Sequence, residues 1–361
     1  MDDQVFSWQT LQSFAEAVFG RIGCDAEAAA LAAEVLLAAD LRGVDSHGVA
    51  RLSGYVRLWE AGRINPTPNI QTVHQTPSTA TIDGDKGLGL VVAPAAMQLA
   101  IQKAQAVGTG WVSVRNSNHF GIAGYHAMMA LPERMIGIAL TNASPLVAPT
   151  FSKERLLGTN PIAIAIPARE EPPIVVDMAT TTVANGKLEI LNRQGGLAPE
   201  GWVQDAQGQA SIDPQALKSG GALLPLGGDR VHGSHKGYCL GAVVDIWSAV
   251  LSGAGYGPWA PPFVSFLPLP SDPQGEGLGH FFGVMRVDAF RPWEEFGEHI
   301  DRWIRRFRAA EPAAGASQVL IPGDPERETE AYRRREGIPL LAPVVEDLRE
   351  LGERLGVDFI Q

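Results

Sequence analysis

The chain has 361 residues, of which 45% are hydrophobic and 19% are charged, and its formal net charge at pH 7 is -11. This composition is ordinary for a folded globular protein, and the length is enough for two domains. The negative charge argues against nucleic acid as a partner, because phosphates would be repelled unless a local basic strip existed. Basic residues do cluster at 302–308 and 333–335, but both clusters lie in amphipathic helical segments and are expected to be solvated faces.

Cysteines and apolar runs bear on the compartment. The two cysteines, Cys24 and Cys239, are too few for a disulfide framework and lack the spacing of metal ligands, so no metal site is expected. A reducing compartment is therefore expected. No N-terminal segment combines positive charge with an apolar core, and apolar runs such as 135–140 are far too short to span a bilayer. These features predict a cytoplasmic protein without a membrane partner.

The N-terminal part of the chain is predicted to be helical. Apolar residues follow a helical period over 11–22, and 25–41 is rich in Ala and Leu, which favour helices. Asp45 or Ser46 can then cap a third helix, whose apolar stripe continues to Gly62.

The middle of the chain reads as mixed α/β, and the C-terminal part is helical again. Two segments rich in Gly or Pro, 195–221 and 258–279, are expected to be loops. The expected strands are 70–73, 80–83, 110–115, 136–142, 161–167, 174–178 and 281–287, and the expected helices are 91–106, 124–131, 237–252, 293–310, 326–336 and 343–355.

Helices at both ends of the chain flank this mixed middle. We expect residues 1–70 and 293–361 to pack together as one discontinuous helical domain, and 71–292 to form a mixed α/β domain. No G-x-G-x-x-G opens a helix after an early strand, so the sequence lacks the Rossmann signature. Gly277-Leu-Gly279 has the wrong spacing to Gly283 and precedes a strand, which indicates a turn.

A histidine and an arginine fall close together on the predicted third helix. His47 and Arg51 are four residues apart and so would lie on neighbouring turns of one face. An imidazole can carry a proton near neutral pH, and a guanidinium offers a fork of donors that fits a carboxylate. The alternative is a chance pairing on a solvated helix face.

This pair belongs to a longer series of motifs. The series is Asp45-Ser-His-Gly-Val-Ala-Arg51, Asn116-Ser-Asn-His-Phe-Gly121, Gly158-Thr-Asn-Pro161, Val176-Asp-Met-Ala-Thr180 and His235-Lys-Gly237 before an apolar helix. Together the motifs resemble the type 2 malate/L-lactate dehydrogenase family, which also contains ureidoglycolate dehydrogenase, diketogulonate reductase, sulfolactate dehydrogenase and piperideine-carboxylate reductase. The match runs in order from about Leu11 to about Pro339.

The resemblance implies a fold and an activity. Family members interconvert a small 2-hydroxy acid, like malate or lactate, and its 2-oxo acid by hydride transfer with NAD or NADP. They hold the cofactor in a nicotinamide-binding domain that is not a Rossmann fold. Members are typically homodimers, and the long apolar N-terminal helices would suit an interface. The expected partner is a small carboxylate substrate.

Two histidines are candidates for the catalytic acid/base, His47 and His119. Some family members are described with the first as the proton carrier and ureidoglycolate dehydrogenase with the second, so both stay open. We favour His47, because Arg51 is its helical neighbour and can anchor the substrate carboxylate. For His119 the alternative is a loop histidine that bonds backbone groups of its own turn.

Asp177 and Ser46 complete the candidate site. Asp177 ends an otherwise apolar strand, so it either caps a turn or orients a catalytic imidazole. Resemblance to piperideine-carboxylate reductase favours the second role. Ser46 can bond the substrate carboxylate, although helix capping explains it as well.

The two phosphates of a nicotinamide dinucleotide need donors. Lys236 lies where the predicted apolar helix begins, and a helix N-terminus with a lysine can bind an anion. By resemblance, the cofactor contacts are Ser144, Asp177, Met178, Ala179, His235, Lys236, Gly237 and Gly323. Asp324 after Gly323 and Thr181 depart from the family pattern, which leaves NAD against NADP open.

Two other functions compete with this one. A cyclic imino acid reductase using NADPH would keep the carboxylate anchor but act on C=N instead of C=O. A non-catalytic binding protein of the same fold would be expected if His47 or His119 were missing, and both are present.

Overall fold

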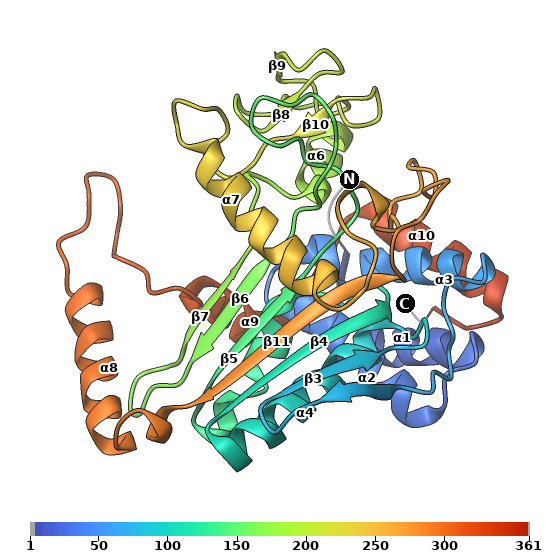
Figure 1. The fold of residues 1–361 in the computed structure, drawn as a ribbon. Coiled ribbons are helices and arrows are strands. Elements are labelled where there is room, and N and C mark those ends of the chain that lie inside the picture. Colours follow the sequence, from blue (N-terminus) through green and yellow to red (C-terminus); the bar gives the residue numbers. More distant parts are fainter. Residues whose placement is uncertain (1–3, 360–361) are drawn as a thin grey trace.

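A seven-stranded sheet forms the centre of the molecule in the computed structural model, which describes residues 4–359 (Figure 1). The strand order is β2-β3-β4-β11-β5-β6-β7. β3 and β4 are parallel, and the other neighbouring pairs are antiparallel. The strands are β2 Gln71–Gln75, β3 Thr79–Asp83, β4 Thr109–Ser117, β5 Met135–Thr141, β6 Ile162–Ile166, β7 Ile174–Met178 and β11 Leu278–Arg286. The expected mixed α/β class is confirmed.

Helices cover both faces of this sheet (Figure 1). On one face α4 (Gly89–Val107) and α5 (Ala123–Met128) bury apolar residues against Val112 and Phe282. On the other face lie α7 (Ser234–Asp245) and a π-helical turn, η4 (Ile246–Val250). Short 3-10 turns complete the chain at η3 Leu131–Glu133, η5 Gly257–Trp259 and η6 Val287–Ala289.

The terminal segments form a second core beside the sheet. Ser7 and Asp25 cap α1 (Trp8–Arg21) and α2 (Ala26–Leu41), because each side chain accepts a bond from an amide of the first turn. The partners of these helices are α3 Leu52–Glu60, α9 Asp324–Glu336, α10 Ala342–Leu355 and the antiparallel pair β1 Gln4–Phe6 and β12 Ile338–Leu340. The large apolar side chains of α1 and α2 are buried within this core, so they do not supply the interface surface suggested above.

Helix α8 (Trp293–Arg308) packs elsewhere, beyond β7 at one edge of the sheet (Figure 1). Its Asp301 carboxylate accepts bonds from the backbone N–H groups of 169–171, and Ile304 packs with Ile174 and Ile321. The division into a helical domain of 1–70 with 293–361 and an α/β domain of 71–292 stays a prediction. Within the expected helical domain, α8 packs apart from the other terminal helices.

The predicted third helix is wrong in its first turns. Two 3-10 turns, η1 (Asp45–His47) and η2 (Val49–Arg51), precede α3, and neither Asp45 nor Ser46 caps a helix. Gly48 separates the two turns with φ -91° and ψ -143°. His47 and Arg51 therefore do not lie on successive turns of one α-helix.

A small subdomain stands above the sheet between β7 and α7 (Figure 1). It contains α6 (Asn185–Arg193), which the sequence did not predict, and a three-stranded sheet of order β10-β8-β9. Two of these strands, β8 and β9, lie inside the expected loop 195–221, and β10 follows it directly. The strands are β8 Val203–Gln204, β9 Ala210–Ser211 and β10 Ala222–Leu223. Its core around Leu188 is separate from the two cores already described. Within residues 4–359, no helix has the length and apolar character needed to cross a bilayer.

Candidate active site

Two imidazoles from distant parts of the chain face one another. His47 lies in η1 and His119 in the loop after β4, and their ring centroids are 5.6 Å apart with the planes inclined by 23°. Nδ1 of His47 is 2.9 Å from Oγ of Ser46. The structure therefore brings both candidate acid/base residues into one cluster, as the motifs suggest.

His119 is held from its inner side. Oη of Tyr55 on α3 lies 2.7 Å from Nδ1 of His119, and the backbone N–H of Gly121 points to the same nitrogen at 3.4 Å. The ring of Phe263 packs at 4.8 Å. Because a backbone N–H can only donate, Nδ1 acts as the acceptor and the neutral ring carries its proton on Nε2.

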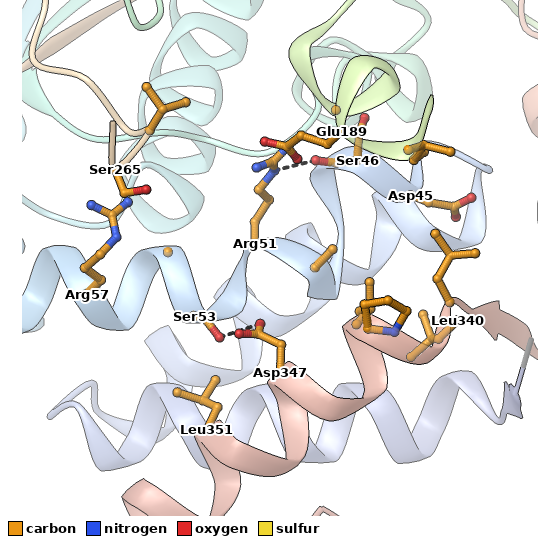
Figure 2. A pocket seen from close by; sticks show the side chains of 18 of the residues that line it. Asp45, Ser46, Arg51, Ser53, Arg57, Glu189, Ser265, Leu340, Asp347 and Leu351 are labelled. Carbon is orange, nitrogen blue, oxygen red and sulfur yellow. Dashed lines mark hydrogen bonds and ion pairs between the residues drawn. The ribbon is translucent and has the colours of Figure 1, made fainter. Parts of the chain in front are cut away.

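Arg51 lies over the same cluster. Its Nε donates to the carbonyl oxygen of Ser46 at 2.5 Å, and its Nη2 is 3.7 Å from Oε2 of Glu189 (Figure 2). Burial, and then the charge of Arg51, lower the pKa of His47 to about 4. Burial lowers the pKa of His119 well below its usual value too, with His47 and Arg51 adding to the effect. Both imidazoles are therefore neutral at neutral pH.

The turn that carries His47 rests on a buried carboxyl group. Asp40 at the end of α2 is only 1% exposed, and its Oδ2 accepts a bond from the backbone N–H of Val49 at 2.8 Å. Its Oδ1 has no hydrogen-bond partner, and burial raises its pKa to about 8. A Cβ at Gly48 would overlap this carboxyl group, so only glycine fits after His47.

A cavity of about 910 Å³ opens beside the cluster (Figure 2). Ser46, Arg51 and Glu189 lie together in its lining (Figure 2), and Phe263 and Glu60 line it too. Ser46 and Phe263 also contact the two imidazoles. A small acid in this cavity would contact Arg51 and Ser46, and Ser46 and Phe263 join the cavity to the two histidines, which do not line it themselves.

Asp177 lies apart from both imidazoles. Its Oδ2 accepts a bond from the backbone N–H of Gly124 at 2.7 Å, in the first turn of α5, and it has no hydrogen bond to a histidine. Partial removal of the carboxyl group from water by the surrounding protein raises its pKa to about 6, although part of the residue is exposed to solvent. This geometry is the turn-capping alternative, so the sequence interpretation that favours orientation of an imidazole has no hydrogen bond to support it.

The other predicted residues lie along the edge strand β7 and at two helix starts. Gly323 precedes α9 and packs on Val175, where a Cβ would come within 3.1 Å of the valine Cβ. Asp177, Met178 and Ala179 follow along the strand and its end. Past that end the backbone N–H of Leu226 bonds to Thr180, and Gly237 of α7 lies so close to Leu226 that a Cβ has no room.

Three further residues, predicted from the sequence as cofactor contacts, differ in how free their side chains are to bind a ligand. Lys236 is exposed in the first turn of α7, and Nδ1 of His235 is 2.9 Å from Nη1 of Arg230. Ser144 is buried, and its Oγ accepts a bond from the backbone N–H of Phe263 at 2.8 Å. Ser144 thereby fixes the aromatic ring that packs on His119.

Comparisons with known proteins show which family the chain belongs to. The family model described as malate/L-lactate dehydrogenase matches residues 6–349. The chain belongs to this family. It is 44% identical over 349 residues to a malate dehydrogenase of Pyrococcus horikoshii, covering 96% of this chain and 94% of the relative. It is 38% identical to an L-sulfolactate dehydrogenase of Methanocaldococcus jannaschii, with 95% and 94% covered. The crystal structure of malate dehydrogenase from Entamoeba histolytica superposes with a TM-score of 0.91 at 37% identity, covering 99% of both chains.

Membership makes the chain an oxidoreductase of the malate/L-lactate dehydrogenase family, and dehydrogenases of this family use nicotinamide cofactors. The residues present suit such a group. The N–H groups at the start of α7 and the exposed Lys236 can face phosphates. Gly237 and Gly323 let backbone approach backbone closely at both ends of β7.

Sequence reasoning missed four residues that the structure places at or next to the candidate site. Tyr55 belongs to the apolar stripe of α3, and a tyrosine buried in such a stripe signals a hydroxyl that needs a partner. Asp40 is a carboxyl group inside an Ala- and Leu-rich helix, which is a similar signal. Phe263 and Glu189 come from distant segments of the chain, and no local sequence pattern predicts that they lie at the site.

Proposed function

We propose that the protein interconverts a small 2-hydroxy acid and its 2-oxo acid, with hydride transfer to or from NAD or NADP. The observation that carries the proposal is the pair of neutral imidazoles of His47 and His119 beside the guanidinium of Arg51. An alcohol next to a carboxylate requires an anchor for the anion and a group that takes the hydroxyl proton, and this cluster supplies both. The relatives named malate and sulfolactate dehydrogenase support the same substrate class.

The residues divide the work as follows. Arg51 binds the substrate carboxylate, with the hydroxyl of Ser46 as a second donor. When bound, the nicotinamide accepts or supplies the hydride. His47 takes the hydroxyl proton during oxidation and returns it during reduction. Support for His47 comes from Ser46, whose Oγ can accept a hydrogen bond from Nδ1–H and so leave Nε2 of His47 as the unprotonated nitrogen.

His119 acts as a hydrogen-bond donor to the same substrate oxygen. Its Nδ1 already accepts from Tyr55 and Gly121, so its Nε2–H is the group available for the substrate. A neutral imidazole in this state polarises a carbonyl without carrying the proton. Asp177 acts on the α5 turn rather than on either imidazole.

NAD or NADP would be held outside any Rossmann fold, by residues of β7 and of the starts of α7 and α9. Lys236 and the first amides of α7 would bind its phosphates, and Asp177, Met178 and Ala179 would contact it from the strand and its end. Gly237 and Gly323 have no side chains that would fill the space next to β7, and His235 is the chain neighbour of Lys236. Ser144 acts indirectly, because its Oγ holds the backbone of Phe263, whose ring packs on His119. A change in NADH or NADPH fluorescence on binding, reduced in Lys236→Ala, tests this placement.

The protein works as a homodimer in this proposal. An apolar stripe on α7, on η4 and on the residue after η4 is exposed on the surface of the chain. It consists of Leu240, Val243, Ile246, Trp247, Val250 and Leu251. An isologous contact would place the stripe of one copy on that of the other. Light scattering after size-exclusion chromatography tests the oligomeric state.

A substrate panel tests the activity. Pyruvate, oxaloacetate and a sulfonated 2-oxo acid are offered with NADH and with NADPH, and oxidation of the cofactor is followed at 340 nm. We expect turnover of at least one of these acids. Piperideine-2-carboxylate is included, and turnover of that imine alone would assign the protein as a cyclic imino acid reductase. Cofactor binding without any turnover would indicate a binding protein.

A further inference from the structure

The guanidinium of Arg51 contacts other groups of the chain in two directions. On one side its Nε donates to the carbonyl oxygen of Ser46 at 2.5 Å. On the other side its Nη2 faces Oε2 of Glu189 at 3.7 Å (Figure 2). A carboxylate from the chain itself therefore lies where a carboxylate from the substrate would bind.

Glu189 is held in this position by its own helix. Its second oxygen accepts a bond from Nδ2 of Asn185 at 2.8 Å, one turn earlier in α6. A Cβ at Gly186 would come within 2.5 Å of Ser46 Cβ and 3.2 Å of Arg51 Nη2. The first turn of α6 thus lies directly on Ser46 and Arg51, and glycine makes this approach feasible.

The contact is suited to being exchanged. The side chains of Arg51 and Glu189 are 20% and 32% exposed to solvent, and both line the cavity. Pairs with this access to water contribute little to stability. Helix α6 also belongs to the small core around Leu188 and Val203 rather than to the core that holds α3.

We propose that Glu189 is a resident carboxylate that competes with the substrate for Arg51 and thereby sets the KM of the enzyme. This inference rests on the proposed role of Arg51 as the substrate anchor. Because the exchange concerns the carboxylate that every 2-oxo acid shares, its effect is common to acids with one and with two carboxylates. The chemical step is unaffected once Glu189 has been displaced.

The test is Glu189→Gln, which removes the charge and keeps the shape of the side chain. We expect the KM for pyruvate and for oxaloacetate, and the inhibition constant of the unreactive analogue oxamate, to fall about two- to fivefold, the scale of a partly exposed ion pair. The kcat is expected to stay within about twofold of the native value. Glu189→Asp, which draws the carboxylate back, is expected to lie between the two and covers the case in which the glutamine variant folds poorly.

Glu60→Gln is the matched control. Glu60 lines the same cavity but pairs with Arg354 at 3.5 Å, so its removal changes the charge of the cavity and not the occupancy of Arg51. We expect an unchanged KM. In an Arg51→Lys background, Glu189→Gln should lose most of its effect, since residues that compete through one partner are not additive.

The results separate this inference from the proposed function. An unchanged or higher KM in folded Glu189→Gln, or a gain confined to the dicarboxylate, would overturn the competition. If native protein turned over no 2-oxo acid, or if Arg51→Lys left KM unchanged, the proposed function itself would fail.

Discussion

Oη of Tyr55 lies 2.7 Å from Nδ1 of His119 and joins helix α3 to the loop that follows β4. The tyrosine is fully buried, and its ring packs against Phe263 and Phe19. Its hydroxyl therefore meets His119 in a fixed direction. The contact links the terminal helical core to the end of the central sheet at the point where the substrate is proposed to react.

Removal of this hydroxyl should impair turnover without affecting the anchor. For Tyr55→Phe we expect kcat to fall about tenfold, the effect of losing one hydrogen bond of about 1.4 kcal/mol in the reacting state. The KM should change little, because Arg51 is untouched. The ¹⁵N shifts of the His119 ring should show the Nε2–H tautomer in the native protein and a mixture in the variant. Tyr125→Phe, which loses a bond to Glu34 on the surface, is the control.

Much of the fold follows from patterns that are local in the sequence. Alternating apolar residues predict the strands of the sheet, the apolar period over 11–22 predicts α1, and the Ala- and Leu-rich run 25–41 predicts α2. Short elements with few residues, such as β12 and α6, leave no such pattern. Their position depends on pairing with β1 and on the subdomain core, which are contacts between distant segments.

The site shows the same division. The His47 and Arg51 pair is visible in the sequence, but the geometry between the two residues depends on Asp40, whose carboxyl group breaks the helix at Gly48. A capping pattern cannot reveal that, because the competing acceptor comes from the preceding helix. The stacking of His47 on His119 likewise depends on how two cores meet.

Replacement of the two histidines by alanine should lower kcat to different extents. His47→Ala is expected to lower kcat about a hundredfold or more, the usual scale for loss of a general acid/base. His119→Ala should cost less, because it removes a hydrogen bond and not the proton carrier. Steady-state rates of both variants in each direction measure this. Near-normal turnover of His47→Ala together with loss of activity in His119→Ala would reverse the two roles.

The low pKa of His47 predicts a pH profile. Oxidation of the hydroxy acid needs the neutral imidazole, which is lost as the pH falls through the pKa of His47 at about 4. The acid limb of kcat/KM for oxidation should therefore lie well below the usual histidine pKa of about 6.5. Arg51→Gln should shift the limb upward, since the nearby cation is the second cause of the low pKa. A native limb near 6.5 would contradict the assignment.

Gly48 has no room for a side chain, so Gly48→Ala should be costly. The new methyl group would overlap the Asp40 carboxyl group and force it away from the Val49 amide. We expect the free energy of unfolding to fall by about 1–3 kcal/mol, the scale of overpacking in a core. Urea denaturation measures this. Adding Asp40→Ala should recover part of the loss, whereas additive losses would show that the two groups do not compete for the space.

Asp40 also predicts how stability depends on pH. In the unfolded chain its carboxyl group loses its proton near pH 3.8, but in the folded protein burial delays this to about pH 8. Between these values the folded state binds more protons, so the free energy of unfolding falls as pH rises, by up to about 1.4 kcal/mol per pH unit for one such group. Asp45 and Arg333 nearby change this effect in opposite directions. Asp40→Asn keeps an acceptor for the Val49 amide and removes the titration.

Relative to native protein, this variant should therefore gain stability steadily from pH 5 to pH 8. Urea denaturation of both proteins at intervals across that range gives the comparison, and the native curve must be subtracted because buried groups such as Asp245 and His280 titrate in both proteins. Parallel curves would show that Asp40 is charged in the folded state. The charge would then have to be balanced under the His47 turn, and the glycine that follows the histidine would border a carboxylate instead of a neutral acid.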